Sequence, residues 1–130
     1  MVPVKAFMVP AAKFVAVDRD ATVRTAAELM RDKGIGSVFV TRENEIIGIV
    51  TDADLVRRLL AEGLDPTQTT AEQIMSAPIV CIDERKTLLD ANDLMARKHV
   101  RHLGVEKDGA LVGMVSVRDM VVFLTNLPRQ

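Results

Sequence analysis

Two short stretches of the chain, Gly48–Asp54 and Gly113–Asp119, combine residue types that can do chemistry. In each, an apolar run carrying one glycine leads to a hydroxyl residue, Thr51 or Ser116, and to an aspartate three positions later. A hydroxyl followed at the third position by an acid is typical of a capping box, in which both side chains satisfy backbone N–H groups at a helix start. The two stretches therefore predict strand-to-helix junctions.

The same junction can also bind a ligand. Unpaired N–H groups and the positive end of a helix dipole attract phosphate, and an aspartate can accept hydrogen bonds from ribose hydroxyls. A glycine inside a strand lets another backbone or a flat ligand come close. Capping alone is the better explanation of one isolated copy, whereas two copies in register favour a ligand-binding role.

The two stretches belong to an internal repeat with an offset of 65 residues, from Gly48 to Gly113. The same offset superposes identical residues along most of each half, among them Val15 on Val80, Asp18 on Asp83, Thr22 on Thr87, Met30 on Met95 and Asp54 on Asp119. A long period found twice predicts two homologous halves rather than a solenoid. We expect a first repeat at 1–63, a linker at 64–73 and a second repeat at 74–130.

Each half is expected to form strand, helix, strand, strand and helix. Thr22 and Thr87 are suitable N-caps, and the apolar residues after them recur at helical spacing, so the methionines there are predicted core residues. Gly63 is a suitable helix end. The expected strands are 14–17, 38–40, 46–50, 79–82, 103–105 and 111–115, with hairpin turns at 42–45 and 107–110 and closing helices at 52–62 and 117–124.

Composition excludes several classes of partner. Seventeen Lys and Arg against eighteen Asp and Glu give a net charge of −1, which argues against binding to a nucleic-acid duplex. No apolar run approaches the roughly 18 residues of a membrane span, so a cytoplasmic location without membrane contact is expected. The single cysteine, Cys81, lies in an apolar run and is predicted to be a buried structural thiol.

No catalytic constellation can be read from the chain. There is no nucleophile with its base and no pair of carboxylates placed for acid–base chemistry, so we predict that the protein is not an enzyme. His99 and His102 are the only histidines, and no cysteine or carboxylate at a suitable spacing completes a metal set, so no metal site is predicted. His99 is expected to end a helix.

The duplicated pattern, with its Gly-apolar-apolar-Thr/Ser-x-x-Asp ending, resembles a tandem pair of cystathionine-β-synthase (CBS) domains. The resemblance covers about Lys5 to Leu124. The second half is the closer match, through Val100–Val105 followed by Leu111–Asp119, and it departs once, with Gly104 where the family commonly has proline. It implies an α/β (α+β) fold of two β-α-β-β-α repeats packed with pseudo-twofold symmetry. It also implies two clefts between the repeats that bind adenosine ligands such as AMP, ADP, ATP, S-adenosylmethionine or NAD.

The resemblance also implies residues for each cleft. The aspartates would hold ribose, the hydroxyl residues would lie near phosphate, and apolar residues would flank adenine. One cleft would use Ile49, Thr51 and Asp54 with Ile79, Val80, Arg101 and His102. The other would use Met114, Ser116 and Asp119 with Phe14, Val15, Gly36 and Ser37. Arg101 and His102 match positions from which basic residues of a related sensor reach phosphate, whereas Gly36 and Ser37 carry no charge.

Two functions from different classes remain open. The favoured one is a non-catalytic module that binds an adenosine-type ligand, most readily AMP, ADP or ATP, and signals its occupancy through its assembly. The alternative is a structural or interaction protein in which the clefts are vestigial and the aspartates serve only as helix caps. Nucleotide hydrolysis ranks third. We also expect a symmetric homodimer, because the closing helix at 117–124 carries much apolar surface.

Overall fold

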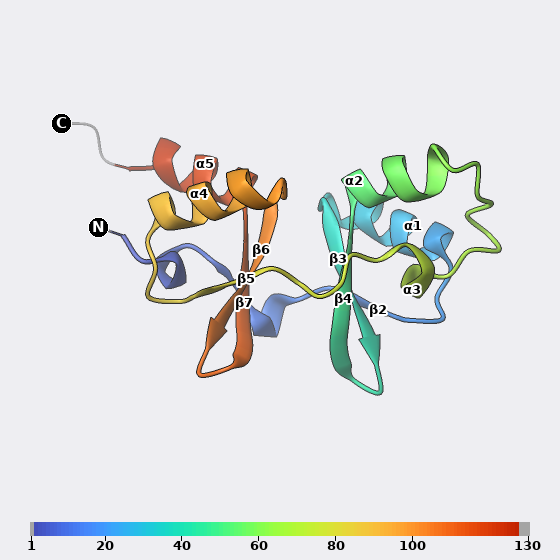
Figure 1. The fold of residues 1–130 in the computed structure, drawn as a ribbon, viewed down its shortest axis with the longest axis horizontal. Coiled ribbons are helices and arrows are strands. Elements are labelled where there is room, and N and C mark those ends of the chain that lie inside the picture. The colour runs from blue at the N-terminus through green and yellow to red at the C-terminus, as the bar shows by residue number, and fades with distance from the viewer. Residues whose placement is uncertain (1, 128–130) are drawn as a thin grey trace. The chain divides into compact units, whose positions relative to one another are not determined.

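The computed structural model describes residues 2–127, which form two compact units. Unit 1 contains residues 2–14 and 80–127, and unit 2 contains residues 15–79 (Figure 1). The mixed α/β class and the two β-α-β-β-α repeats are confirmed. The units differ from the sequence repeats, however, because the first fourteen residues pack with the second repeat and residues 64–79 pack with the first.

Unit 2 is a three-stranded sheet with its helices. β2 pairs in parallel with β3, and β3 pairs in antiparallel fashion with β4. The elements are β2 (Ala16–Asp18), α1 (Val23–Lys33), β3 (Ser37–Arg42), β4 (Glu45–Thr51), α2 (Asp52–Asp54), a π-helical segment (Leu55–Leu60) and α3 (Ala71–Ile74). The closing helix is therefore not a uniform α-helix over 52–62, because it changes to π-type bonding after its first turn. Gly63 follows with a left-handed backbone (φ 67°) and donates to the Leu60 carbonyl, as expected of a residue at a helix end.

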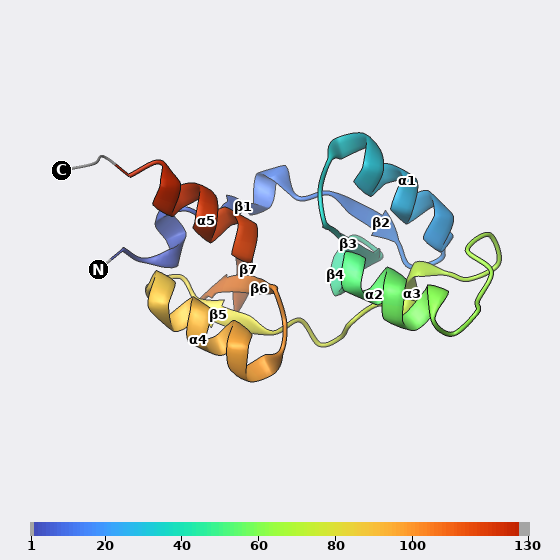
Figure 2. The same cartoon turned by 90° about the horizontal axis from the view of Figure 1, so that it is seen from above.

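Unit 1 is a four-stranded sheet in the order β1-β7-β6-β5. β5 pairs in parallel with β6, and the other neighbours are antiparallel. The elements are two short 3₁₀ turns (Val4–Ala6 and Ala11–Lys13), β1 (Val9–Pro10), β5 (Cys81–Asp83), α4 (Leu88–Lys98), β6 (His102–Lys107), β7 (Ala110–Ser116) and α5 (Val117–Thr125). Figure 2 shows the blue N-terminal segment with β1 beside the red elements of this unit.

The helix boundaries follow from capping chemistry. The Thr22 hydroxyl accepts a hydrogen bond from the Thr25 amide at 3.1 Å, and the Thr87 hydroxyl accepts one from the Asp90 amide at 3.2 Å. At the other ends, Gly34 (φ 64°) and His99 (φ 55°) both take the left-handed conformation that terminates a helix. The predicted caps and the role of His99 as a helix end are confirmed.

Each unit has its own apolar core between the sheet and the helices. Met30 and Met95 are buried at equivalent places, which confirms their prediction as core residues. The core of unit 2 consists of Val17, Val23, Ala26, Met30, Val38, Val40, Val50, Ala71 and Ile74. The core of unit 1 consists of Val4, Ile82, Ala91, Met95, Leu103, Val105, Val115 and Met120.

The predicted hairpin turns are two-residue loops. Glu43 and Asn44 have φ values of 51° and 67°, and Asp108 and Gly109 have φ values of 51° and 82°. Two successive positive φ values are characteristic of the type I′ turn, whose twist suits a hairpin. Both hairpins extend away from the helices of their unit (Figure 1).

The segment predicted as a linker is built into unit 2. The Thr69 carbonyl accepts a hydrogen bond from the Val23 amide, and the Ala71 amide donates to the Ala21 carbonyl, both at 2.8 Å. Thr69 and Ala71 are buried. The N-terminal segment is built into unit 1 in the same way, since the Val4 amide donates to the Lys86 carbonyl at 2.7 Å. The first residues of each repeat therefore pack in the unit that contains most of the other repeat.

These exchanged lead-in segments, Val4–Pro10 and Ala71–Ser76, end beside the glycine of each junction strand. The amide of Ile49 donates to the Ser76 carbonyl at 3.0 Å, and the Ser76 amide donates back at 2.8 Å. β1 pairs with β7 in the same way, with Val9 opposite Met114. A Cβ atom added to Gly113 would lie 3.0 Å from the Val9 carbonyl oxygen and would clash with the Met8 sulfur, and Gly48 faces Met75 and Ser76 alike. The close approach that glycine permits is therefore used by the protein's own backbone.

We expect Gly113→Ala to destabilise the protein by about 1–3 kcal/mol, the usual range for overpacking a closed site. The added methyl must displace Met8 and crowd the Val9 carbonyl. Denaturant unfolding measures the loss, and the double variant Met8→Ala with Gly113→Ala is the control. Because Met8→Ala removes the clashing sulfur, the double variant should lose less than the sum of the single losses; strictly additive losses would contradict the close contact.

Candidate functional site

Both strand-to-helix junctions form the predicted capping boxes. At the first, the Thr51 amide donates to Asp54 Oδ2 at 2.9 Å, and the Asp54 amide donates to the Thr51 hydroxyl at 3.2 Å. At the second, the Ser116 amide donates to Asp119 Oδ2 at 2.9 Å, and the Asp119 amide donates to the Ser116 hydroxyl at 3.1 Å. The hydroxyl and the carboxylate of each junction are therefore fixed side by side at a helix start.

The Asp54 carboxylate makes further contacts that the sequence did not reveal. Its Oδ1 atom accepts a hydrogen bond from the Ser76 hydroxyl at 2.9 Å and lies 3.5 Å from Arg58 Nε. The Arg58 guanidinium also donates to the Met75 carbonyl at 2.8 Å. The Arg58 side chain is half exposed and contacts two groups of unit 2. Its spacing of four residues from Asp54 is the signal that could have found this ion pair.

The Asp119 carboxylate has different surroundings. The position equivalent to Ser76 is Val9, since each pairs with the residue after the junction glycine. The repeat offset places Phe123 where the first junction has Arg58. Phe123 stacks on Phe7 with 5.1 Å between ring centroids. Both neighbours that bind the Asp54 carboxylate are thus apolar at Asp119, which is also more exposed than the buried Asp54.

The basic residues predicted to face phosphate lie at the start of β6. His102 is the cross-strand partner of Ser116, and the Arg101 carbonyl accepts a hydrogen bond from the Val117 amide at 3.1 Å. Within unit 1, both therefore neighbour the Ser116 junction. In unit 2, Ser37 pairs with Thr51, and the Gly36 carbonyl accepts a hydrogen bond from the Asp52 amide at 3.0 Å. The assignment of Arg101 and His102 to the Asp54 cleft, and of Gly36 and Ser37 to the Asp119 cleft, stays a prediction.

The predicted apolar residues lie on the junction strands or just before the first strand of each repeat. Ile49 and Met114 directly follow the junction glycines. The Val15 and Val80 carbonyls each accept a hydrogen bond at 2.9 Å, from Phe39 and Gly104 respectively. The chain passes from one unit to the other between Phe14 and Val15 and again between Ile79 and Val80.

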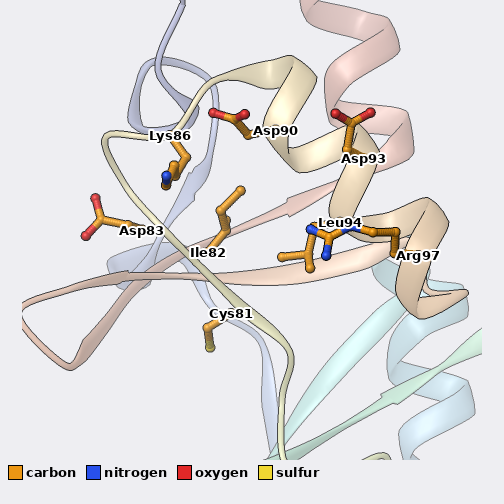
Figure 3. A pocket seen from close by; sticks show the side chains of 8 residues that line it. All are labelled: Cys81, Ile82, Asp83, Lys86, Asp90, Asp93, Leu94 and Arg97. Atoms are coloured by element: carbon orange, nitrogen blue, oxygen red, sulfur yellow. The ribbon is translucent and has the colours of Figure 1, made fainter.

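A separate open groove of about 380 Å³ lies in unit 1 along β5 and α4 (Figure 3). It contains none of the predicted site residues; its lining is Cys81, Ile82, Asp83, Lys86, Asp90, Asp93, Leu94 and Arg97. Burial, and secondarily the charge of Glu106, raises the pKa of the Cys81 thiol. Cys81 is only partly buried, contrary to expectation, but its raised pKa disfavours the thiolate that a nucleophile needs.

Residues 2–127 contain neither a candidate metal site nor a candidate membrane span. Within this range, no three or more His, Cys, Asp or Glu side chains are grouped so that they could hold a metal ion. None of the helices in the same range has the length and apolar character needed to cross a membrane.

The duplicated fold and the duplicated junction define a tandem-repeat α/β protein. A family model for the CBS domain matches residues 4–61 and 71–126, so the chain belongs to the CBS-domain family, as its resemblance indicated. Tandem CBS domains form a regulatory module.

Curated relatives agree with this family. CBS domain-containing protein YhcV of Bacillus subtilis is 33% identical over 106 residues, which cover 82% of this chain and 75% of YhcV. Uncharacterized protein MK0525 of Methanopyrus kandleri is 38% identical over 102 residues, or 75% of this chain. The matched part is only 52% of MK0525, so the chain spans about half the length of that relative.

Solved structures share the fold over nearly the whole chain. An uncharacterized conserved protein from Pyrococcus horikoshii superposes with a TM-score of 0.88 at 24% identity, covering 99% of this chain and 96% of that one. CBSX2, solved in complex with AMP, gives 0.78 at 23% identity and covers 99% and 100%. A hexameric CBS-CP12 protein from bloom-forming cyanobacteria gives 0.81 at 27% identity and covers 99% and 76%.

The Asp83 carboxylate, which lines the groove, has a shifted pKa that can be tested. Hydrogen bonds from the Arg85 side chain, first, and from the Arg85 amide lower the pKa of Asp83 to about 2. Because this pKa lies below the unfolded value of about 3.9, the interaction stabilises the fold above pH 4 and is lost as the pH falls toward 2. Arg85→Ala should therefore raise the pKa of Asp83 in an NMR titration. Asp90, whose pKa is lowered by Thr87, is the internal control and should not change.

Proposed function

We propose that this chain is a non-catalytic regulatory module that binds an adenosine-type ligand, with AMP, ADP or ATP favoured over S-adenosylmethionine or NAD. The observation that carries the proposal is the duplicated junction, which holds a hydroxyl and a carboxylate together at a helix start in both units. The AMP complex of CBSX2, a protein of the same fold, supports the choice of ligand.

The chemistry of the junction suits a nucleoside phosphate. Ribose hydroxyls donate to a carboxylate, whereas phosphate accepts from backbone N–H groups, hydroxyls and guanidinium groups. Arg101 and His102 would supply positive charge for the phosphate. Adenine would lie against the apolar residues of the prediction, which are Ile49, Ile79, Val80, Met114, Phe14 and Val15.

A second function keeps specific support. Both aspartates complete capping boxes, so each already has a structural role that needs no ligand. A structural or interaction protein with vestigial clefts would use them for this purpose only. The two functions differ in whether a compound with ribose hydroxyls stabilises the protein.

A thermal-shift series separates the two functions. A nucleotide at a hundredfold its dissociation constant should add about 2.7 kcal/mol, which raises the melting temperature by roughly ten degrees for a chain of this size. The matched control is the 2′,3′-dideoxy form of the same nucleotide, which lacks the hydroxyls that an aspartate would hold. Equal shifts would contradict the ribose role. If AMP, ADP, ATP, S-adenosylmethionine and NAD all leave the midpoint unchanged, the structural alternative is favoured.

We also propose that the protein forms a homodimer and that ligand occupancy is signalled through this assembly. α5 exposes Val121, Val122 and Leu124 by 53%, 49% and 50%, an apolar surface that is unusual for a lone small domain. The hexameric CBS-CP12 protein shows that a related chain assembles.

Sedimentation at tens of micromolar should give a mass of twice 14.3 kDa. Val121→Glu should shift the protein toward the monomer, because it places a charge in the apolar surface of α5. Leu89→Glu, at an equally exposed position of α4, is the control for loss of an exposed apolar side chain. A monomeric parent protein would contradict the proposal.

A further inference from the structure

We infer that the two junctions are not equivalent. Arg58 and Ser76 occupy the Asp54 carboxylate from within unit 2, so the first junction acts as a structural lock and the ligand is held through Asp119. The second half of this inference rests on the proposed function, since it states which junction takes the ligand and how many ligands each chain binds.

Both oxygens of the Asp54 carboxylate are engaged. Oδ2 accepts from the Thr51 amide at 2.9 Å and from the Thr51 hydroxyl at 3.1 Å. Oδ1 accepts from the Ser76 hydroxyl at 2.9 Å and forms the ion pair with Arg58 at 3.5 Å. A carboxylate offers about four lone-pair sites, and Asp54 is only 6% exposed. Ribose hydroxyls would have to displace donors that the chain itself supplies.

The displaced donors would also lose structural roles. Arg58 bonds the Met75 carbonyl as well as Asp54, and Ser76 is tied to Ile49 by two backbone hydrogen bonds. The network therefore joins three parts of unit 2: the end of β4, the π-helical segment and the lead-in segment. Opening it for a ligand would release these contacts together, because the same side chains serve all of them.

Neither donor has a counterpart at Asp119. Val9 occupies the place of Ser76 and carries no hydroxyl, while Phe123 occupies the place of Arg58 and stacks on Phe7. The capping bond from the Ser116 amide uses Oδ2. The Asp119 carboxylate is therefore held in an equivalent capping box, but the second junction has no counterpart of the two donors that contact Oδ1 of Asp54.

Charge favours the same junction. Arg101 and His102 lie beside Ser116 in unit 1, whereas the equivalent Gly36 and Ser37 lie beside Thr51 and are uncharged. A phosphate at the start of α5 would meet a guanidinium and an imidazole from the neighbouring strand. We therefore assign Arg101 and His102 to the ligand at Asp119, in place of the Asp54 cleft to which the family resemblance assigned them, because both residues neighbour Ser116 within unit 1.

Titration calorimetry with AMP tests the inference on the full chain. We expect one AMP per chain. Asp119→Ala should weaken binding roughly ten- to a hundredfold, as expected for loss of hydrogen bonds to a charged group. Asp54→Ala should lower the melting temperature but leave the dissociation constant within about twofold of the parent value. Two equivalent sites, or equal weakening by the two variants, would overturn the inference and leave the proposed function intact.

Two nearly isosteric substitutions give a sharper comparison. Val9→Thr adds a hydroxyl where the first junction has Ser76, so it should weaken AMP binding at Asp119. Ser76→Ala removes that hydroxyl from Asp54, so it should lower the melting temperature without changing AMP affinity. The opposite pattern would show that Ser76 and Arg58 yield to the ligand, and the lock would be wrong.

The lock also has a test that needs no ligand. The losses in melting temperature caused by Asp54→Ala and Ser76→Ala should be strongly non-additive, because both remove the same hydrogen bond. Additive losses would overturn the lock even if AMP binds. If AMP binds neither the parent nor any variant, the proposed function and the ligand half of the inference both fail, and the double-mutant cycle alone decides the structural half.

Discussion

The pairing of a lead-in segment with the glycine of a junction strand is the constraint on which both units depend. Ser76 lies against Ile49 next to Gly48, and Val9 lies against Met114 next to Gly113. A side chain at either glycine would push the backbone partner away from the strand. The lead-in segment thus pairs with the strand that ends in the capping box, and in unit 2 this pairing places the Ser76 hydroxyl beside Asp54.

This pairing explains how one backbone supports two different junctions. The capping box needs only the hydroxyl, the carboxylate and the helix start, and it is the same in both units. The lead-in residue and the residue four positions after the aspartate are free to differ. Ser76 and Arg58 make the first carboxylate part of a polar network, whereas the equivalent positions of the second junction hold the apolar residues Val9 and Phe123.

Local features could be predicted from the sequence, since each depends on residues a few positions apart. Thr22, Thr87 and the boxes at Thr51 and Ser116 are satisfied within one helical turn, and the type I′ hairpins depend on two residues each. The ion pair of Asp54 and Arg58 is equally local, because the two residues lie four positions apart on one helical segment. The contact of Ser76 with Asp54 joins residues 22 positions apart and depends on strand pairing, so no local sequence pattern predicts it.

The exchange of lead-in segments could not be predicted for a related reason. A repeat in the sequence shows that two stretches share an ancestor, but it does not show which of them packs together. Val4 bonds to Lys86, and Ala71 bonds to Ala21, so each lead-in segment completes the unit built on the other repeat. Neither repeat, cut at its sequence boundary, contains the lead-in residue that pairs with its own junction strand. Divergence at Val9 or Ser76 therefore alters the junction of the other repeat, which is how a symmetric duplication can acquire two unequal sites.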